Sequence, residues 1–201
     1  GADTISEKEE IARTIPIIDA ITSSFPNIVI SIDTFRSQVA KEAIYSGAAI
    51  VNDISGGEGD SQMFSVIADL QTPYIMMHMQ GTPQNMQTNP TYGDVVFDII
   101  KYFSSKIDKL TKLGVNDIVL DPGFGFGKTI NHNYEMLDRF EEFNILNLPV
   151  LAGLSRKSMI YKKLNITPEE SLHETCRLNG IALTKGADII RVHDVKEALE
   201  C

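Results

Sequence analysis

The chain has 201 residues, and its hydrophobic fraction of 43% is enough for a substantial core. Eighteen Lys and Arg residues against twenty-seven Asp and Glu residues give a formal net charge of −9. This charge argues against general nucleic-acid binding, because that function needs a basic surface. No apolar run approaches the roughly 20 residues that are needed to span a membrane, and no signal peptide is visible.

The two cysteines, Cys176 and Cys201, show no CxxC or other metal-binding spacing. The simplest interpretation is a reduced, cytoplasmic compartment, with Cys176 as a small core residue and Cys201 as a terminal residue. Because roughly 100–200 residues per domain is usual, we predict a single domain over residues 1–201.

The N-terminal half of the chain alternates helical and strand-like segments. A helix is predicted over residues 7–24, where Ser6 and Glu9 form a capping-box pattern. Pro16 lies inside this segment and should kink or interrupt the helix, because proline has no N–H to donate. The next elements are predicted as a strand at 27–33, a helix at 37–46, a strand at 48–53, a helix at 60–71 and a strand at 73–78.

The C-terminal half continues the alternation. An amphipathic helix is predicted over 94–113, and Gly114 is a good signal for its end. Asn131 is expected to cap the helix after the next strand, and Pro168 to open the last long helix. In order, the predicted elements after Gly114 are a strand at 117–121, a helix at 132–143, a strand at 149–155, a helix at 168–185 and a strand at 187–193.

The predicted strands are continuous apolar runs, which is typical of parallel strands that are covered on both faces. Their alternation with helices indicates an α/β fold, either an open doubly wound sheet or a (β/α)8 TIM barrel. The barrel is favoured because each strand ends in polar residues, and only a barrel brings all these ends to one face. Six βα units are recognisable, so we expect a barrel that lacks its first two units. The polar ends are Asp33-Thr34, Asn52-Asp53, His78, Asp121, Ser155-Arg156-Lys157 and Arg191 with His193-Asp194.

The glycine-rich stretch LDPGFGFGKT (120–129) resembles a nucleotide-binding loop only superficially. The P-loop spacing requires a glycine where this chain has Pro122, and glycines at alternate positions do not fit G-x-G-x-x-G. The stretch instead presents Asp121 at a strand end, followed by glycines that allow a ligand to approach closely. The plainest interpretation of Lys128 is a solvated loop charge.

The last two strand ends carry a cationic group in an acidic protein. Lys157, Arg156, Arg191 and His193 indicate an anionic ligand that is held by charge-assisted hydrogen bonds. A helix that begins near Ser158 would add positive potential. Barrels often bind phosphate near the seventh and eighth strands, which is where these residues fall if two strands are missing.

A second group of strand-end residues is suited to a flat, polar heterocycle. Asp33 and Asp121 can accept hydrogen bonds from N–H groups, and Asn52 can both donate and accept. Together the two groups predict a heterocycle that carries a phosphate or diphosphate.

Plainer interpretations exist for most of these positions when each is taken alone. A strand-end aspartate often caps the next helix, and Asp53 is a candidate for that role. His78 is as readily a satisfied core histidine as a ligand, and methionines such as Met76 are more typical of core packing. The functional prediction therefore depends on several such residues lying together.

Six motifs follow one another along almost the whole chain: SIDT (31–34), VNDI (51–54), HMQGTPQNMQ (78–87), LDPGFGFGKT (120–129), LAGLSRKSMI (151–160) and IIRVHDVKE (189–197). In this order they resemble the dihydropteroate synthases, a folate-pathway family with a (β/α)8 barrel. The resemblance implies the condensation of 6-hydroxymethyl-7,8-dihydropterin diphosphate with p-aminobenzoate, which gives 7,8-dihydropteroate and diphosphate. It also implies Mg²⁺ as cofactor, a homodimer, and inhibition by sulfonamides.

The same resemblance implies roles for individual residues. Asp33, Lys157, Arg191 and His193 are expected to be catalytic. The pterin would be held by Asp33, Asn52, Asp121 and Lys157 in a slot lined by Met76 and Gly153, the diphosphate by Arg191 and His193, and p-aminobenzoate by Phe126, Ser155 and Lys157.

Two segments of the family pattern are absent from the sequence. These are the N-V-T-P-D-S-F-S-D-like and G-E-S-[ST]-R-P-G-like segments, and the missing parts include an Asn that helps to bind Mg²⁺ in the family. We therefore expect an N-terminally truncated barrel, either folded but inactive alone or part of a longer chain, with no metal ligand of its own. The alternatives are a pterin-binding fragment without turnover and a pterin-dependent methyltransferase domain, which Arg191, His193 and the SRKS motif disfavour.

Overall fold

The structure, a computed structural model, describes residues 5–200. It divides into two compact units: the first comprises Gly1–Met77 and Lys106–Val119, and the second comprises His78–Ser105 and Leu120–Cys201. Helix α4 (Val95–Lys112) and strand β4 (Ile118–Asp121) contribute residues to both units. The single domain over 1–201 stays a prediction.

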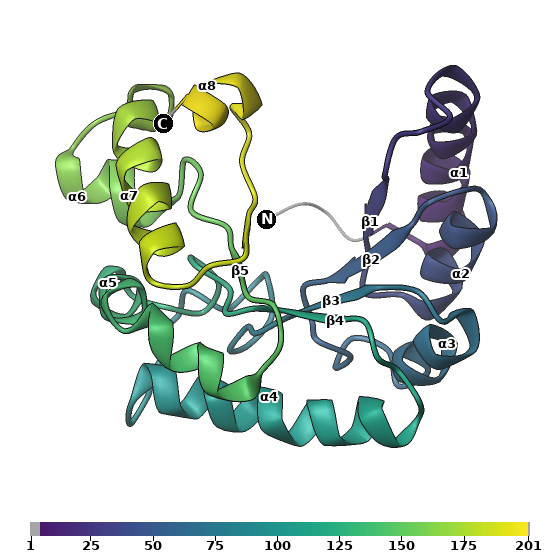
Figure 1. The fold of residues 1–201 in the computed structure, drawn as a ribbon, viewed down its shortest axis with the longest axis horizontal. Coiled ribbons are helices and arrows are strands. Elements are labelled where there is room, and N and C mark those ends of the chain that lie inside the picture. The colour runs from purple at the N-terminus through teal and green to yellow at the C-terminus, as the bar shows by residue number, and fades with distance from the viewer. Residues whose placement is uncertain (1–4, 201) are drawn as a thin grey trace. The chain divides into compact units, whose positions relative to one another are not determined.

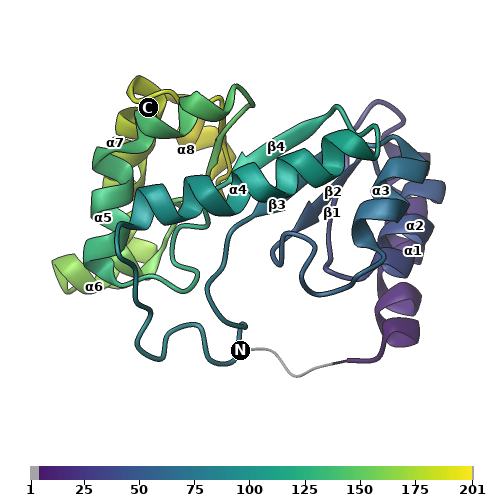
Figure 2. The same ribbon diagram turned by 90° about the horizontal axis from the view of Figure 1, so that it is seen from below.

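Short parallel strands form the centre of the first unit. Strands β1 (Ser31–Asp33), β2 (Ile50–Asp53) and β3 (Tyr74–Met77) pair in the order β1-β2-β3, and β4 follows β3 in the sheet. All four residues of β3 are buried, as expected for a strand that is covered on both faces. Helices α1 (Glu7–Ser24), α2 (Ser37–Tyr45) and α3 (Met63–Leu70) lie side by side along the same side of these strands (Figures 1 and 2).

Helix α1 begins as the sequence predicts and continues through its proline. Ser6 Oγ accepts a hydrogen bond from the Glu9 N–H at 3.2 Å. The expected interruption at Pro16 is wrong, because the helix runs unbroken from Glu7 to Ser24. Pro16 is exposed, so solvent can satisfy the carbonyl group that a proline leaves unpaired.

The second unit has its own parallel pairings. The Leu120 N–H donates to the Pro149 carbonyl at 2.9 Å, and Leu120 bridges Val150 in parallel. Strand β5 (Leu151–Ala152) pairs in parallel with β6 (Ile189–Ile190). The helices of this unit, besides the first part of α4, are α5 (Ile130–Asp138), α6 (Ser158–Leu164), α7 (Leu172–Thr184) and α8 (Val195–Glu200), with 3₁₀ turns at Phe140–Leu146 and Glu169–Ser171.

Three phenylalanines form the aromatic part of the core of the second unit. Phe124, Phe140 and Phe143 are each at most 1% exposed. The rings of Phe124 and Phe140 stack with centroids 6.0 Å apart, and Phe143 meets Phe140 edge-on at 5.6 Å. The first aromatic residue of the glycine-rich stretch therefore packs inside the unit.

The predicted helices after β4 differ from the structure in their bounds. Thr129, not Asn131, caps α5: Thr129 Oγ1 accepts from the His132 N–H at 3.1 Å, and His132 Nδ1 accepts from the Thr129 N–H at 3.3 Å. The helix therefore begins at Ile130 and ends at Asp138, where a 3₁₀ turn replaces the predicted last turn. The strands are shorter than the apolar runs that predicted them, because only part of each run forms ladder pairs.

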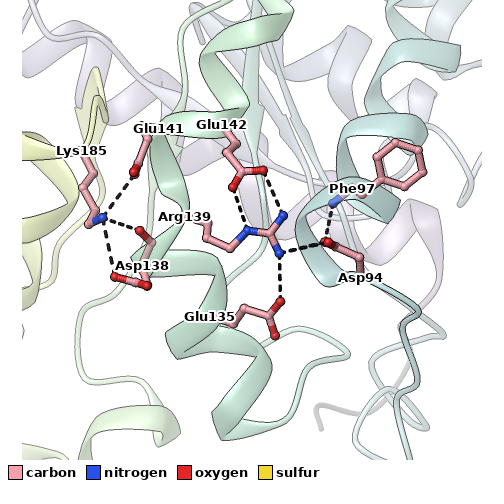
Figure 3. A network of polar contacts seen from close by, with 8 residues as sticks. All are labelled: Asp94, Phe97, Glu135, Asp138, Arg139, Glu141, Glu142 and Lys185. Carbon is pink, nitrogen blue, oxygen red and sulfur yellow. Dashed lines mark hydrogen bonds and ion pairs between the residues drawn. The ribbon is translucent and has the colours of Figure 1, made fainter.

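A cluster of charges holds the start of α4 against the end of α5 (Figure 3). Arg139 contacts Asp94 at 3.1 Å, Glu135 at 3.0 Å and Glu142 at 2.7 Å. Asp94 also accepts from the Phe97 N–H, and this bond, followed by Arg139, lowers the pKa of Asp94. Beside it, Lys185 contacts Asp138 and Glu141. This cluster stabilises helix ends and stands apart from the predicted site residues in the sequence.

The remaining expectations about the chain as a whole have mixed outcomes. Within residues 5–200, no helix is both long enough and apolar enough to cross a membrane. Cys176 is half-buried in α7, so it is not the fully buried core residue that was expected, and the reduced compartment stays a prediction. Cys201 lies outside the described residues.

Candidate functional site

Two of the predicted site residues meet across the sheet of the first unit. Asp33 and Asn52 are register partners at the carboxyl ends of β1 and β2. The Thr34 N–H donates to the Asn52 carbonyl at 3.0 Å, which holds this end of the pairing. Asp33 is exposed and Asn52 is half-buried, so both side chains are accessible within the unit.

The loop after β2 is organised around Asp53, which is fully buried. Its carboxylate accepts from the Ser55 N–H at 2.8 Å, the Ser55 hydroxyl at 2.7 Å, the Gly57 N–H at 2.8 Å and the Tyr74 hydroxyl at 2.7 Å. The plainer interpretation of Asp53 as the cap of the next helix is therefore wrong, because α3 begins after Gln62 with no side-chain cap, and Asp53 instead holds the turn that follows β2. This carboxylate shapes the loop beside Asn52.

Lys106 adds a second charge to the same loop. Its ammonium donates to the Gly56 carbonyl at 2.7 Å and pairs with Glu58 at 3.0 Å. Burial lowers the pKa of Lys106, while Glu58 and then Asp53 oppose that change. The loop between β2 and α3 is thus held by side chains of both signs.

Met76 is fully buried on β3, opposite Asp53 in the register. Met77, its neighbour, is 2% exposed. Both methionines belong to the core of the first unit, as the plainer interpretation holds. A contact of Met76 with a ligand stays a prediction.

Asp121 ends β4 in the second unit. The His78 N–H donates to its carbonyl at 2.9 Å, and its Oδ1 accepts from the Gly123 N–H at 2.8 Å. Burial raises the pKa of Asp121; the Gly123 bond and then Lys157, Lys128 and Arg191 oppose this. A carboxylate in this position is suited to accept N–H groups of a ligand.

The glycine loop, residues 123–127, follows Asp121 and requires its glycines. Gly123, Gly125 and Gly127 have φ values of +74°, +79° and +58°, a region that residues with a Cβ rarely adopt. A Cβ on Gly127 would lie 2.4 Å from the Gln80 carbonyl oxygen. The loop therefore makes a close backbone approach that other residue types could not make.

Lys157 lies against the glycine loop. Its Nζ is 4.3 Å from the centroid of the Phe126 ring, which is within cation–π distance. A Cβ on Gly125 would lie 3.2 Å from Lys157 Cδ, so the side chain also contacts the backbone of the loop. The structure thus brings together two of the residues predicted for the p-aminobenzoate pocket.

A hydrogen-bonded chain connects Ser155, His193 and Arg191. Arg191 Nη1 lies 2.7 Å from His193 Nε2, and His193 Nδ1 lies 2.9 Å from Ser155 Oγ. A guanidinium can only donate, so Nε2 accepts and Nδ1–H donates to Ser155. Ser155 Oγ also accepts from the His193 backbone N–H at 3.2 Å. This pattern leaves the hydroxyl proton of Ser155 directed elsewhere.

The protonation of His193 follows from its surroundings. Burial lowers its pKa, the positive charges of Arg191 and Arg156 lower it further, and Asp194 opposes them. A neutral imidazole agrees with the acceptor role of Nε2. Binding of an anion at Arg191 would offset one of these positive charges and raise the pKa of His193.

Arg156 does not belong to the available cationic group, contrary to the prediction. It forms a bidentate pair with Asp194, with Nε to Oδ2 at 2.9 Å and Nη2 to Oδ1 at 2.5 Å. Its φ of +54° places it in the left-handed region at the turn between β5 and α6. The pair connects the SRKS turn to the segment after β6, which carries His193.

Lys128 also differs from its predicted role. It is 3% exposed, so the expectation of a solvated loop charge is wrong. Its Nζ lies 3.0 Å from the carbonyl oxygens of Gly123 and Phe126 and 3.0 Å from His78 Nδ1. His78 is 7% exposed and has partners, which is the core interpretation. No local pattern in the sequence signals a lysine that folds back under its own loop.

The structure therefore groups the predicted residues within each unit. In the first unit, Asp33 and Asn52 are adjacent. In the second unit, Phe126 contacts Lys157, and Ser155, His193 and Arg191 form one chain. Gly153 follows β5 directly. A Cβ added to Gly153 would have only Leu151 Cδ2 nearby, at 4.0 Å, so the space beside this glycine is open.

Magnesium has no ready set of ligands among the described residues. Within residues 5–200, no three His, Cys, Asp or Glu side chains gather in a way that could hold a metal ion. Mg²⁺ prefers oxygen ligands and is often bound through substrate phosphates with few protein ligands. The residues described here do not by themselves form its site, and we derive no step through it.

Comparisons with known proteins agree with this geometry. A family model described as "Pterin binding enzyme" matches residues 1–193. The dihydropteroate synthase of Escherichia coli is 43% identical over 202 residues, which cover 100% of this chain and 71% of that protein.

Solved structures give the same result. The Yersinia pestis dihydropteroate synthase, solved with a sulfonamide drug complex, has a TM-score of 0.93 and 39% identity, with 98% of this chain and 72% of that chain covered. The Xanthomonas albilineans dihydropteroate synthase with 4-aminobenzoic acid has a TM-score of 0.91 and 32% identity, with 100% and 71% covered. The predicted (β/α)8 fold class is thereby confirmed, and the chain belongs to the dihydropteroate synthase family of pterin-binding enzymes.

Proposed function

We propose that this chain is the catalytic part of a dihydropteroate synthase. It condenses 6-hydroxymethyl-7,8-dihydropterin diphosphate with p-aminobenzoate and releases 7,8-dihydropteroate and diphosphate. The observation that carries the proposal is the arrangement of Lys157 on the Phe126 ring together with the Ser155–His193–Arg191 chain. It supplies cations for a leaving anion and an aromatic surface for an aromatic amine. Membership of the family supports the same reaction.

Departure of the diphosphate is the first step. The bond between the exocyclic carbon and the bridging oxygen breaks, and the electron pair leaves with diphosphate. Arg191 stabilises the charge that develops on the leaving group, and His193 becomes a second donor to it as its pKa rises. Asp33 is the carboxylate proposed to stabilise the remaining pterin cation.

The pterin is held by polar groups at the strand ends. Asp33 and Asp121 accept from ring N–H and amino groups, and Asn52 donates and accepts. Lys157 donates to a ring acceptor. Met76 and Gly153 line the slot, and the absence of a side chain at Gly153 leaves room for a flat ring.

The second substrate attacks the pterin cation. The aniline nitrogen of p-aminobenzoate forms the new C–N bond and then loses a proton to solvent. Phe126 and Lys157 hold the ring of p-aminobenzoate, and Ser155 donates its hydroxyl proton to the carboxylate. The Xanthomonas relative was solved with 4-aminobenzoic acid and the Yersinia relative with a sulfonamide, which supports this pocket and predicts inhibition by sulfonamides.

Three further features are part of the proposal. Mg²⁺ accompanies the diphosphate, where it would screen the charge of the leaving group. The protein acts as a homodimer, binds small molecules rather than nucleic acid or membrane, and is cytoplasmic. Equilibrium sedimentation of the intact protein tests the dimer, and omission of Mg²⁺ from the turnover assay tests the metal.

The deciding experiment measures binding and turnover in the intact protein. Lys157→Ala and Arg191→Ala should each weaken binding of the pterin diphosphate by about tenfold or more, since a charge-assisted hydrogen bond contributes roughly 1.5–3 kcal/mol. Lys185→Ala, at the charge cluster of Figure 3, is the matched control and should leave binding unchanged. Unaltered binding in both site variants would contradict the proposed site.

The same experiment separates the alternatives that the sequence left open. Pterin binding by the wild type without formation of dihydropteroate would favour a binding module. Transfer of a methyl group from a methylated pterin, with no diphosphate release, would favour a methyltransferase. The family membership favours the synthase over both.

A further inference from the structure

The proposed reaction does not use Lys128, although this lysine is among the most buried charged groups of the second unit. It is 3% exposed. Its Nζ donates to the Gly123 and Phe126 carbonyls at 3.0 Å each and contacts His78 Nδ1 at 3.0 Å. An ammonium has three N–H donors, so these three partners satisfy it.

The loop curls around this lysine. The two carbonyls that it binds lie near opposite ends of the glycine loop, three residues apart. Both point toward one Nζ, and the left-handed conformations of the glycines make that turn possible. Without the amine, the Gly123 carbonyl would keep only the Phe126 N–H at 3.1 Å, and the part-buried Phe126 carbonyl would lose its lysine donor, which is unfavourable.

Other side chains complete the hydrogen bonding of the loop. Gln87 donates to the Gly125 carbonyl at 2.7 Å, and Tyr92 donates to the Gly127 carbonyl at 2.7 Å. The Gly125 N–H donates to Asn133 at 2.7 Å. The loop is therefore fixed from several directions, with Lys128 as its buried centre.

The loop in turn places the two groups proposed to bind the aromatic amine. Phe126 presents its ring to Lys157 Nζ, and Gly125 contacts the Lys157 side chain. A shift of the Phe126 carbonyl would move the ring and remove the surface on which Lys157 lies. Asp121 depends on the loop only through the Gly123 N–H, while its carbonyl accepts from the His78 backbone N–H, a pairing between strand ends that lies outside the loop.

We propose that Lys128 is a positioning residue for the second substrate: it holds the glycine loop so that Phe126 and Lys157 form the surface that binds p-aminobenzoate. This inference rests on the proposed function and adds a residue to it. Lys128 acts through Phe126 and touches neither substrate. Burial lowers the pKa of Lys128 to about 7, and the charge of Asp121 opposes this change. The lowered pKa agrees with a structural role in which the hydrogen bonds of the amine matter more than its charge.

The test is a double-mutant cycle in the intact protein. Lys128→Met keeps a long side chain and removes all three donors. We expect KM for p-aminobenzoate to rise about tenfold or more, as misplacement of a binding surface implies. The dissociation constant for pterin diphosphate should stay within about threefold of the wild type. In a Phe126→Leu background the same substitution should change KM by less than about twofold, since interacting residues are not additive.

Several outcomes would overturn the inference. One is a rise in KM for p-aminobenzoate that is fully additive with Phe126→Leu. Another is an equal loss of affinity for both substrates, and a third is an unchanged KM. If Lys128→Met does not fold, Lys128→Gln serves instead, because its amide keeps two N–H donors for the two carbonyls. Lys128→Gln should then raise KM for p-aminobenzoate but not the dissociation constant for pterin diphosphate. The rise in KM should be smaller than the tenfold rise expected when all three donors are lost.

A control separates this inference from the proposed function. If the wild-type protein forms no dihydropteroate, the proposed function fails, and the dissociation constant for p-aminobenzoate then replaces KM in the cycle and still tests the role of Lys128. If the wild type turns over and Lys128→Met behaves as the wild type does, only the role of Lys128 fails. Lys185→Met, a half-buried lysine of the same unit that contacts Asp138 and Glu141, should leave both constants unchanged.

Discussion

Two loops follow strand ends that carry proposed substrate ligands, and they are built with opposite charge. The loop after Asn52 surrounds the buried carboxylate of Asp53, which gathers two backbone N–H groups and two hydroxyls. The glycine loop after Asp121 surrounds the buried ammonium of Lys128, which gathers two backbone carbonyls. In each case the ligand residue and the residue that shapes its loop are different residues. In both loops, the buried charge supports the loop beside the proposed ligand residue.

The largest expected effect comes from removing the centre of the first loop. Asp53→Ala leaves two N–H groups and the Tyr74 hydroxyl without their buried acceptor. We expect the free energy of unfolding to fall by about 3–5 kcal/mol, as when one partner of a buried polar network is removed. Chemical denaturation measures this change. A loss below that of a single exposed hydrogen bond would show that the carboxylate does not hold the loop.

Lys128, the buried charge of the second loop, should make the free energy of unfolding depend on pH. Burial lowers the pKa of Lys128 to about 7 in the folded protein from its ordinary 10.5, so the unfolded state binds more protons between these pH values. The free energy of unfolding should therefore rise with pH in this window, by up to about 1.4 kcal/mol per pH unit from this group. Lys128→Met should lack that rise. Parallel pH profiles for the two proteins would contradict a buried lysine.

The free energy of unfolding should change less when only one hydrogen bond to Asp53 is removed. Tyr74→Phe removes the hydroxyl that donates to Asp53 at 2.7 Å, while the ring stays packed and the other three donors remain. We expect a loss of about 1.5–3 kcal/mol in the free energy of unfolding, the range for a hydrogen bond to a charged group. Additivity of Tyr74→Phe with Asp53→Ala would argue against the contact, because the hydroxyl has nothing to bind once Asp53 is gone.

The smallest effect should come from charges that lie nearer the surface. Arg139→Ala breaks contacts with Asp94, Glu135 and Glu142 at two helix ends (Figure 3). Exposed ion pairs contribute little, so we expect a loss of about 1 kcal/mol or less. That loss should shrink further at high salt, because salt screens exposed charges. A salt-independent loss as large as that of Asp53→Ala would mean that the cluster is as important as a buried network.

The sequence predicts those parts of the fold that depend on residues close together in the chain. Continuous apolar runs predicted buried parallel strands such as β3, and the Ser6–Glu9 pattern predicted the start of α1. The cap of α5 is Thr129 and not the predicted Asn131, and Thr129 and His132 have the spacing of a capping box. The usual residue at the third helical position of that box is Glu or Gln, so His132 gives a weak signal in the sequence.

The candidate site was predicted residue by residue, but its internal contacts were not. The sequence indicates that Ser155, Arg191 and His193 follow strands, yet only the fold connects them in one chain. It likewise gives Arg156 a free positive charge, while the fold pairs it with Asp194. The sequence predicts a solvated charge at Lys128, because it does not show that the glycine loop closes over its own lysine, which is 3% exposed.

The most direct test of the account is the stoichiometry of the reaction in the intact protein. Pterin diphosphate and p-aminobenzoate are supplied together, and diphosphate and dihydropteroate are both measured over many turnovers, with and without Arg191→Ala. The account predicts equal amounts of the two products from the wild type and a large loss of both in the variant. Diphosphate release without a new C–N bond, or turnover unchanged by the loss of Arg191, would contradict it.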